Sequence, residues 1–105
     1  MKIEANYMNL ILGFLVPNYN LTYSLTNKYP IVKITPEMVE ESDDDLEGFE
    51  GYSFQCLKID GKHKHDGQDV EYTFQITSPE GKKVKFKTEM NLVCGWNLCE
   101  DIEIK

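Results

Sequence analysis

A strictly alternating segment in the second half of the chain limits the possible folds more than any other feature. Residues 70–77, VEYTFQIT, alternate apolar and polar side chains without a break, which is the period of a half-buried β-strand. The next four residues, SPEG, place Ser, Pro and Gly at the first, second and fourth positions of a type I turn, and KKVKFKT follows as a return strand. The sequence therefore predicts a β-hairpin in the core sheet, with these inward-facing side chains: Val70, Tyr72, Phe74 and Ile76.

Other segments add strands to this hairpin. YSFQCLKID predicts a strand whose alternation slips between Cys56 and Leu57, as at a β-bulge. Residues 19–26 alternate as a strand does, TNKYP predicts a turn, and IVKIT predicts the strand after it. The C-terminal segment LCEDIEIK puts Leu98, Ile102 and Ile104 on one face and can close the sheet. On the outer face of the hairpin, lysines are expected opposite polar residues: Lys83, Lys85 and Lys87 opposite Glu71, Thr73 and Gln75.

Two segments are candidates for helices. Residues 6–16, NYMNLILGFLV, are apolar on most sides and fit either a buried helix or a buried strand, which Pro17 is expected to end. Thr35 and Pro36 form a good helix start, because the hydroxyl can cap free N–H groups and Pro fits the first helical position. That helix is expected to run to about Leu46 and to stop at Gly48. The predicted fold class is α+β, a single domain over residues 1–105 with an antiparallel sheet of about five or six strands and one or two helices packed on it.

Composition excludes several kinds of protein. All eleven basic residues are Lys and the net charge is −7, so direct nucleic-acid binding is disfavoured, because Arg makes the bidentate contacts to phosphate and guanine. The longest apolar run, residues 8–16, is far shorter than the roughly 20 residues that cross a bilayer. Glu4 and the lack of a small-residue cleavage site argue against a signal peptide. Three cysteines form no recognised disulfide framework, which favours a reducing, cytoplasmic location.

The net negative charge comes from one quarter of the chain. Residues 34–57 contain eight acids and no Lys, and the rest of the chain contains ten acids and eleven Lys. Within this quarter, residues 40–51 read EESDDDLEGFEG, with seven acids. Acids in the first turn of a helix favour its dipole, which accounts for Glu37, but the dipole opposes acids near the C-terminal end.

Three interpretations of this acidic segment remain open. It can be a solvated loop that maintains solubility. It can be a contact surface for a basic partner, anchored by interleaved apolar side chains; the residues predicted to bind that partner are Glu40, Glu41, Asp43, Asp44, Asp45, Glu47, Phe49 and Glu50. It can also be a calcium loop, but Phe54 stands where an EF-hand requires a bidentate Glu.

Histidine, cysteine and tryptophan provide weaker signals. His63 and His65 are two residues apart, so in an extended loop both could bind one Zn²⁺ with a nearby carboxylate, although a polar hairpin tip is the simpler interpretation. Cys94 and Cys99 have the spacing C-x4-C, which matches no zinc or redox motif, and they are expected to be small core residues. Trp96 is either part of the core or an exposed anchor, and no Cys–His pair identifies a hydrolase.

We therefore expect a cytoplasmic, non-enzymatic protein without a cofactor, whose acidic face binds a basic surface of another macromolecule. In size, acidity and lack of catalytic motifs the chain is similar to the small inhibitor proteins that phages encode, including those that mimic the charge of nucleic acid. That resemblance implies an inhibitor that blocks a nucleic-acid-binding host protein. The alternatives are a small metal-binding or enzymatic domain that uses His63 and His65 with nearby carboxylates, and an accessory or structural subunit of an assembly.

Overall fold

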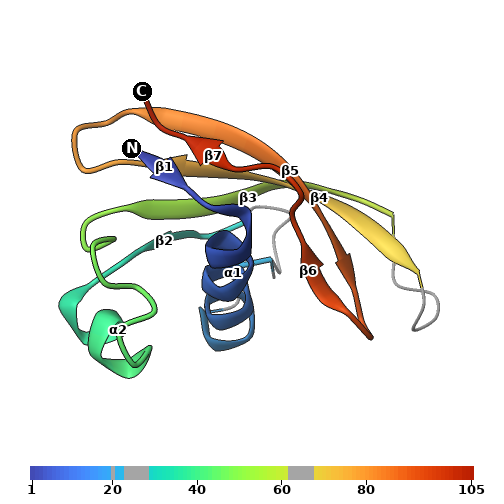
Figure 1. The fold of residues 1–105 in the computed structure, drawn as a ribbon, viewed down its shortest axis with the longest axis horizontal. Helices are drawn as coiled ribbons and strands as arrows, with labels where there is room; N and C mark the ends of the chain where they lie inside the picture. Colours follow the sequence, from blue (N-terminus) through green and yellow to red (C-terminus); the bar gives the residue numbers. More distant parts are fainter. Residues whose placement is uncertain (20, 23–28, 62–67) are drawn as a thin grey trace.

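The predicted hairpin lies in the middle of a five-stranded antiparallel sheet (Figure 1). The computed structural model describes residues 1–19, 21–22, 29–61 and 68–105. The sheet has the order β2-β3-β4-β5-β6, and its strands are β2 (Ile31–Lys33), β3 (Ser53–Asp60), β4 (Asp69–Thr77), β5 (Lys83–Asn91) and β6 (Gly95–Asn97). With a two-stranded sheet and two helices in addition, the structure confirms the α+β class.

The β4–β5 hairpin forms as the alternation predicts. Phe74 stands opposite Phe86, and the turn is closed by a hydrogen bond of 2.9 Å from the Gly81 N–H to the Ser78 carbonyl. All four side chains predicted to face inward are at most 7% exposed. The predicted bulge is also present, since the register between β3 and β4 shifts between Cys56 and Lys58.

On the outer face of the hairpin, the register between β4 and β5 differs from the predicted one by one pair of outward-facing residues. Lys87 stands opposite Thr73 and Lys85 opposite Gln75, which leaves Glu71 opposite Glu89. Lys87 and Glu71 still form a diagonal ion pair, with Nζ and Oε1 3.7 Å apart. Opposite charges therefore meet across a diagonal rather than directly.

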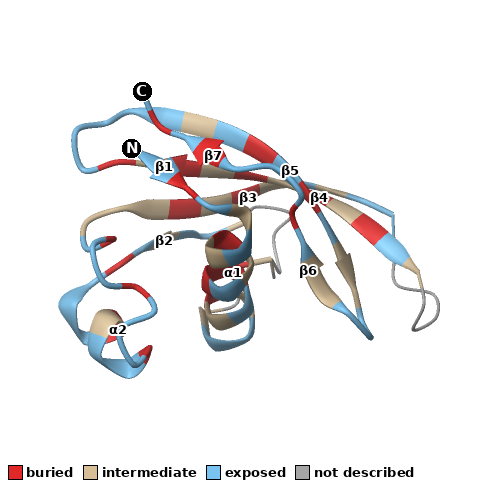
Figure 2. Cartoon of the chain, viewed as in Figure 1, coloured by how far each residue is buried: buried red, intermediate tan, exposed pale blue. Residues whose placement is uncertain are grey.

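The N-terminal apolar segment is a helix, α1 (Ala5–Tyr19). It packs against the inner face of the sheet through fully buried side chains that belong to one core with those of the sheet. Figure 2 marks the buried residues on both the helix and the strands. The prediction that Pro17 ends this element is wrong, because the helix continues to Tyr19. Pro17 lies in the last turn, where its missing N–H costs one hydrogen bond, and the Asn18 side chain donates to the Phe14 carbonyl at 2.7 Å.

The prediction of a strand over residues 19–26 is wrong where the structure describes these residues, and the rest of it is not tested. Tyr19 belongs to α1, and residues 21–22 form a turn. Leu21 is fully buried, so its apolar side chain joins the core without strand geometry. The remaining residues of the predicted strand lie outside the described residues, as does most of the TNKYP turn.

The C-terminal segment pairs with the N-terminus instead of closing the main sheet. β1 (Lys2–Ile3) and β7 (Ile102–Glu103) form a separate antiparallel pair, in which Ile3 stands opposite Ile102. The Ile104 N–H also donates to the Met1 carbonyl at 2.8 Å. The three apolar residues of the tail are buried as expected. Leu98 directly follows β6, whereas Ile102 lies in β7 and Ile104 just after it.

The three cysteines and the tryptophan differ in burial. Cys94 and Cys99 are exposed, so their predicted place in the core is wrong: Cys94 lies in the turn between β5 and β6, and Cys99 follows β6. Only Cys56 is buried. Trp96 is half-buried and lies edge-on to Tyr72 and Phe74, with ring centroids 4.9 and 5.5 Å away.

Candidate partner-binding surface

The acidic segment begins with a short helix, α2 (Pro36–Glu41). Its start is as predicted: the Thr35 hydroxyl accepts a hydrogen bond of 3.3 Å from the Met38 N–H, and Pro36 occupies the first turn. The helix ends five residues before the predicted Leu46. The reason is that Asp43 and Asp44 have φ angles of 52° and 70°, and the left-handed region is incompatible with a continuing right-handed helix.

Ser42 organises the chain after the helix. Its hydroxyl donates to the Val39 carbonyl at 2.8 Å and accepts from the Leu46 N–H at 3.1 Å. Ser42 is 4% exposed, so both hydrogen bonds are protected from water. Further turns follow, each closed by one backbone hydrogen bond between 3.0 and 3.1 Å, from the N–H groups of Asp45, Glu47, Phe49 and Tyr52.

The two ends of the segment are joined. The Ile34 N–H donates to the Tyr52 carbonyl at 2.8 Å, and the Gly51 N–H donates to the Ile34 carbonyl at 2.9 Å. Residues 35–50 therefore leave and re-enter the fold at one place, as in a compact Ω-loop packed by its own side chains. We call residues 35–50 the acidic loop.

The apolar residues of the acidic loop point into the protein. Met38, Leu46 and Phe49 are 6%, 0% and 3% exposed and belong to the main core. The Phe49 ring lies 5.7 Å from that of Tyr7 and 5.3 Å from that of Tyr52. Phe49 was expected to contact a partner, but its side chain is buried in the core and is not exposed for binding. These residues instead fix the loop, since burying each such side chain contributes about 1.5–3 kcal/mol.

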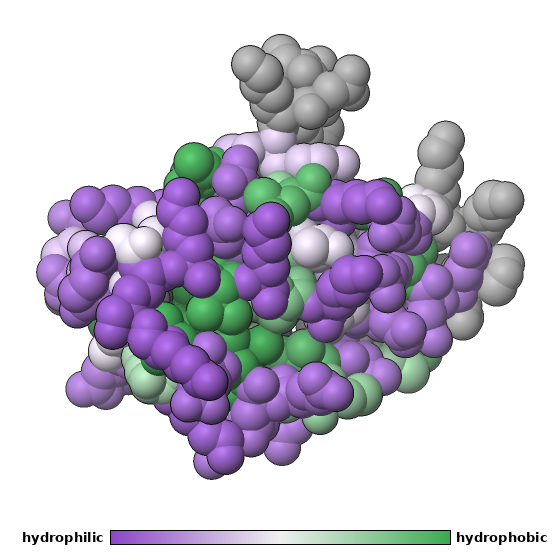
Figure 3. Space-filling model, turned by 90° about the horizontal axis from the view of Figure 1, so that it is seen from above, coloured by the Kyte–Doolittle hydropathy of each residue, from purple (hydrophilic) through white to green (hydrophobic). Residues whose placement is uncertain are grey.

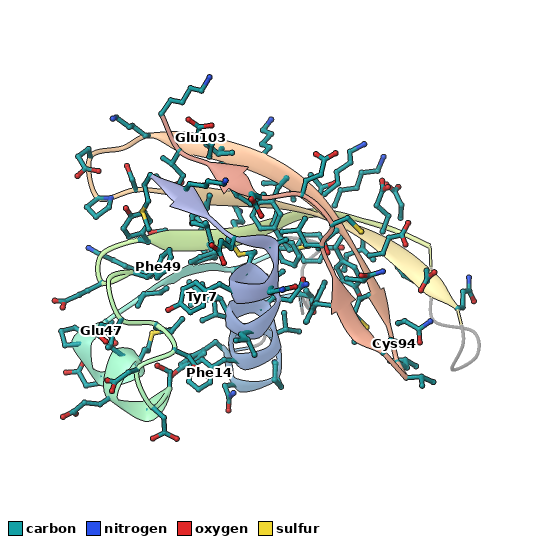
Figure 4. All side chains as sticks on the ribbon, in the orientation of Figure 1. Tyr7, Phe14, Glu47, Phe49, Cys94 and Glu103 are labelled. Carbon is teal, nitrogen blue, oxygen red and sulfur yellow. The ribbon has the colours of Figure 1, made fainter. Side chains whose placement is uncertain are left out.

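Two tyrosines of α1 hold the loop from the other side. The Tyr7 hydroxyl donates to the Asp45 carbonyl, and the Tyr19 hydroxyl donates to Oε2 of Glu41 at 2.8 Å. Figure 4 shows Tyr7 pointing from α1 toward the part of the chain that carries Glu47 and Phe49. The loop is therefore tied to α1 at two points, once through the backbone of Asp45 and once through the side chain of Glu41.

Burial, and then the acids of the loop, raise the pKa of both tyrosines. The pKa of Tyr7 is raised from 10.0, first by burial and then by the negative charges of Asp45 and Glu47. The pKa of Tyr19 is also raised, by burial and by its hydrogen bond to Glu41. Both phenols thus remain protonated donors over a wider pH range than free tyrosine.

The carboxylates of the loop point outward. Glu37 and all seven predicted acidic residues are exposed: Glu40, Glu41, Asp43, Asp44, Asp45, Glu47 and Glu50. In the described part of the chain every ion pair lies elsewhere, namely Lys2–Asp101, Lys58–Asp60 and Lys87–Glu71. The loop thus presents negative charge that no described lysine neutralises within the molecule.

Metal binding finds no support at the acidic loop. Among the described residues no group of three or more His, Cys, Asp or Glu side chains is arranged to hold a metal ion. The calcium-loop alignment fails at Phe54, which is fully buried within β3. His63 and His65, the basis of the zinc hypothesis, lie outside the described residues.

The sequence did not identify the residues that hold the loop. Tyr7 and Tyr19 contact residues 38 and 22 positions away, and no local pattern signals contacts over that distance. The sequence gives a partial indication of the role of Ser42, because Ser is favoured at helix ends, where its side chain can hydrogen-bond to backbone groups. The exposed acids themselves were identified from charge alone.

Fold and surface together define a small α+β protein with an ordered acidic loop. Comparisons of the chain with protein-family models, with curated proteins and with solved structures found no match. Neither helix of the described chain is long and apolar enough to span a membrane.

Proposed function

We propose that this protein binds a macromolecule with a basic surface, and that the acidic loop is the contact. The observation that carries the proposal is the combination of exposed, unneutralised carboxylates with a fixed backbone. Three buried apolar side chains and two tyrosine hydrogen bonds hold the loop. A run of acids that serves solubility alone needs no such support.

A fixed loop is favourable for binding for two reasons. Because the backbone is already ordered, association costs less conformational entropy than it would for a disordered acidic tail. Because the carboxylates have no lysine partners in the described structure, their field extends into solvent and can steer a basic partner toward the loop.

The finer proposal is an inhibitor without enzymatic activity. A partner that normally binds nucleic acid carries lysine and arginine side chains that contact phosphates. The fixed carboxylates of the loop are negatively charged, as phosphates are, so they could occupy the same basic surface. Binding of this protein would then exclude nucleic acid from that surface. An accessory subunit of an assembly would use the same contact with a different consequence.

The test compares two variants of equal net charge. One replaces Asp43, Asp44 and Asp45 with Asn, and the matched control replaces three exposed acids outside the loop with Gln, namely Glu4, Glu100 and Glu103. Binding of a labelled oligoarginine peptide is measured by fluorescence anisotropy at several salt concentrations. We expect the loop variant to bind more weakly, mainly through slower association, while the control retains most of the affinity.

Salt dependence provides the second criterion. Wild-type affinity should fall as the Debye length shortens from about 10 Å at 0.1 M to about 3 Å at 1 M ionic strength. Equal losses in the two variants would show that only net charge matters, and the loop would then be a solubilising segment. Partners recovered from a lysate of the source cell are then tested with the same pair of variants and with competing nucleic acid.

A further inference from the structure

The outer face of the main sheet contains lysines at one end and acids at the other. Successive side chains of a strand point to opposite faces, and Phe54, Phe74 and Phe86 are buried on the inner face. The strand register then places the outward-facing residues in rows that run across the sheet. Two rows at one end contain lysines and no acid: Lys33, Ser53, Thr77 and Lys83 in the first, and Ile31, Gln55, Gln75 and Lys85 in the second. We call these two rows the basic half.

Two rows at the other end contain acids and no lysine. Their members are Asp60, Glu71, Glu89 and Asn97 in one row, and Asp69, Asn91 and Gly95 in the next. We call these two rows the acidic half. A middle row of Lys58, Thr73 and Lys87 separates the halves. Its two lysines pair with Asp60 and Glu71 at 3.1 and 3.7 Å, so the charges of the middle row are already used.

The lysines of the basic half are not neutralised by any described acid. Lys33, Lys83 and Lys85 are exposed, and every ion pair of the described residues involves other lysines. A hollow of about 250 Å³ lies in this half, lined by Lys83 and by uncharged residues that include Ser53, Gln75 and Thr77. Because no described carboxylate lines it, the hollow suits a carboxylate from another molecule.

The acidic half contains two carboxylates that repel each other. Glu71 and Glu89 stand directly opposite each other on β4 and β5, an arrangement that destabilises a sheet. Lys87 pairs with Glu71, but Glu89 forms no ion pair with a described residue. A lysine from a second molecule would reduce this repulsion.

The outer face is also where two copies repel each other least. Its described residues include five lysines and four acids, a net charge of +1, whereas the whole chain carries −7. The described helices and the β1–β7 pair pack on the inner face, because their buried side chains form one core with those of the sheet. The face is therefore not covered by any described helix or strand.

The β5 edge of the sheet does not suit contact between copies. The hollow along this edge is lined by two lysines and five carboxylates: Glu71, Glu89, Glu100, Asp101 and Glu103. Figure 3, which views the molecule from the side of β5 and β7, shows hydrophobic side chains in the middle and hydrophilic ones around them. Two copies that met through this edge would bring carboxylates together.

We propose that the outer face of the sheet binds a second copy of this chain, related by a two-fold axis that runs along the middle row. Rotation about this axis reverses the strand direction, so the basic half of each copy lies on the acidic half of the other. Lys83 and Lys85 then lie near the partner's Glu89. Strand spacings of about 4.8 Å and 3.3 Å per residue give a face of roughly 500 Å² per copy. Because this is below the area of about 800 Å² in a standard interface, we expect a weak dimer.

Sedimentation equilibrium between about 10 μM and 1 mM protein measures the association, and we expect a dissociation constant on the order of 0.1 mM. Association should stop at the dimer, because a two-fold contact closes on itself. It should also weaken as the Debye length shortens from about 10 Å at 0.1 M salt to about 3 Å at 1 M.

Two charge reversals locate the contact. Lys83→Glu with Lys85→Glu should weaken dimerisation at least about tenfold. Glu71→Lys with Glu89→Lys should weaken it similarly, although this variant carries less net negative charge than wild type. The control Lys2→Glu with Lys105→Glu changes two exposed lysines outside the face and should retain most of the dimerisation. Lys83→Gln with Lys85→Gln replaces the first reversal if that variant does not fold, and should give a smaller loss.

Mixing the two reversed variants provides the sharpest test. Each variant lacks attraction to its own kind, but in a one-to-one mixture both contacts again join opposite charges. The mixture should therefore form a heterodimer about as tightly as wild type forms its homodimer. Carbodiimide cross-linking of mixed ¹⁴N and ¹⁵N wild-type chains should join Lys83 or Lys85 of one copy to Glu71 or Glu89 of the other.

Any of three results would overturn the proposal: a protein that stays monomeric at the highest concentration, dimerisation unchanged by the lysine reversal, or no heterodimer in the mixture. Dimerisation lost in the variant with Asn at positions 43–45 would also overturn it, because the acidic loop would then occupy the basic half. We expect that variant to dimerise as wild type does. Oligoarginine binding by the loop and dimerisation by the sheet can thus fail separately.

Discussion

The Tyr19 hydroxyl of α1 donates a hydrogen bond to Glu41 at the end of α2, with Oη and Oε2 2.8 Å apart. Together with the hydrogen bond from Tyr7 to the Asp45 carbonyl, it connects the N-terminal helix to the acidic loop. Both contacts require a neutral phenol as the donor.

Stability should therefore decrease at alkaline pH. The pKa of each tyrosine is higher in the folded protein than its ordinary value of 10.0. A raised folded-state pKa stabilises the fold below the unfolded-state pKa, and this contribution is lost as the pH rises through the folded-state pKa. We expect the free energy of unfolding, measured with urea between about pH 8 and pH 11, to fall above about pH 10. The double variant Tyr7→Phe, Tyr19→Phe should show a shallower fall, and an identical pH dependence would contradict this assignment.

Truncating the centre of the hairpin should strongly destabilise the protein. Phe74 is fully buried and opposes Phe86, so Phe74→Ala should cost about 3–5 kcal/mol in the free energy of unfolding. Lys83→Ala, on the exposed side of the same hairpin, should change it by no more than about 0.5 kcal/mol. Chemical denaturation measures both, and an unchanged midpoint for Phe74→Ala would contradict the core assignment.

Two substitutions at Asp44 should separate the effect of its backbone conformation on stability from the effect of its charge. Its φ angle is 70°, a conformation that Asn tolerates and that costs most other residues about 1–2 kcal/mol. Asp44→Asn should therefore leave stability unchanged or slightly increased, since it also relieves like-charge repulsion in the loop. Asp44→Ala removes the same charge but should lower the free energy of unfolding by about 1 kcal/mol. Equal stabilities in thermal and urea unfolding would show that the left-handed backbone is not retained in solution.

The three cysteines should differ in reactivity. Cys94 and Cys99 are exposed, whereas Cys56 is buried and burial raises the pKa of its thiol to about 11. Because the thiolate is the nucleophile, alkylation of the native protein near neutral pH should modify two cysteines quickly and Cys56 only slowly. Mass spectrometry after timed iodoacetamide treatment counts the modified residues. Rapid modification of all three in folded protein would contradict the burial of Cys56.

The metal-binding alternative has a direct test. If His63 and His65 are loop residues only, the purified protein should carry no stoichiometric metal. Elemental analysis after mild desalting measures this content. One zinc per chain, lost in a variant with both histidines changed to Ala, would favour the metal-binding alternative over the function proposed above.

The sequence predicted the parts of the fold that depend on periodicity. The unbroken alternation of residues 70–77 set the hairpin and its buried face, and the slip at Cys56 marked the bulge. These signals are local, because a period of two reports directly which side chains share a face.

Features that depend on distant contacts were not predictable in the same way. The pairing of β1 with β7 involves two residues from each end of the chain, too few to show any period. The early end of α2 follows from the left-handed backbone of Asp43 and Asp44, which acids permit but do not require. For the acidic loop, charge identified the exposed carboxylates, but their number suggested a solvent-facing segment and obscured the inward direction of Phe49.

The hydrogen bonds of Ile34 to Gly51 and Tyr52 also bear on how this protein can change over time. These hydrogen bonds close the acidic loop at its base. Substitutions on the outside of the loop should therefore not disturb the pairing of β2 with β3. Glu41 accepts the hydrogen bond of Tyr19, and Asp43 and Asp44 have a left-handed backbone. Provided that Met38, Leu46 and Phe49 keep the loop packed, its other charged positions can vary one by one at little cost to the fold. Partner preference could then diverge between descendants of this chain while the sheet beneath remains the same.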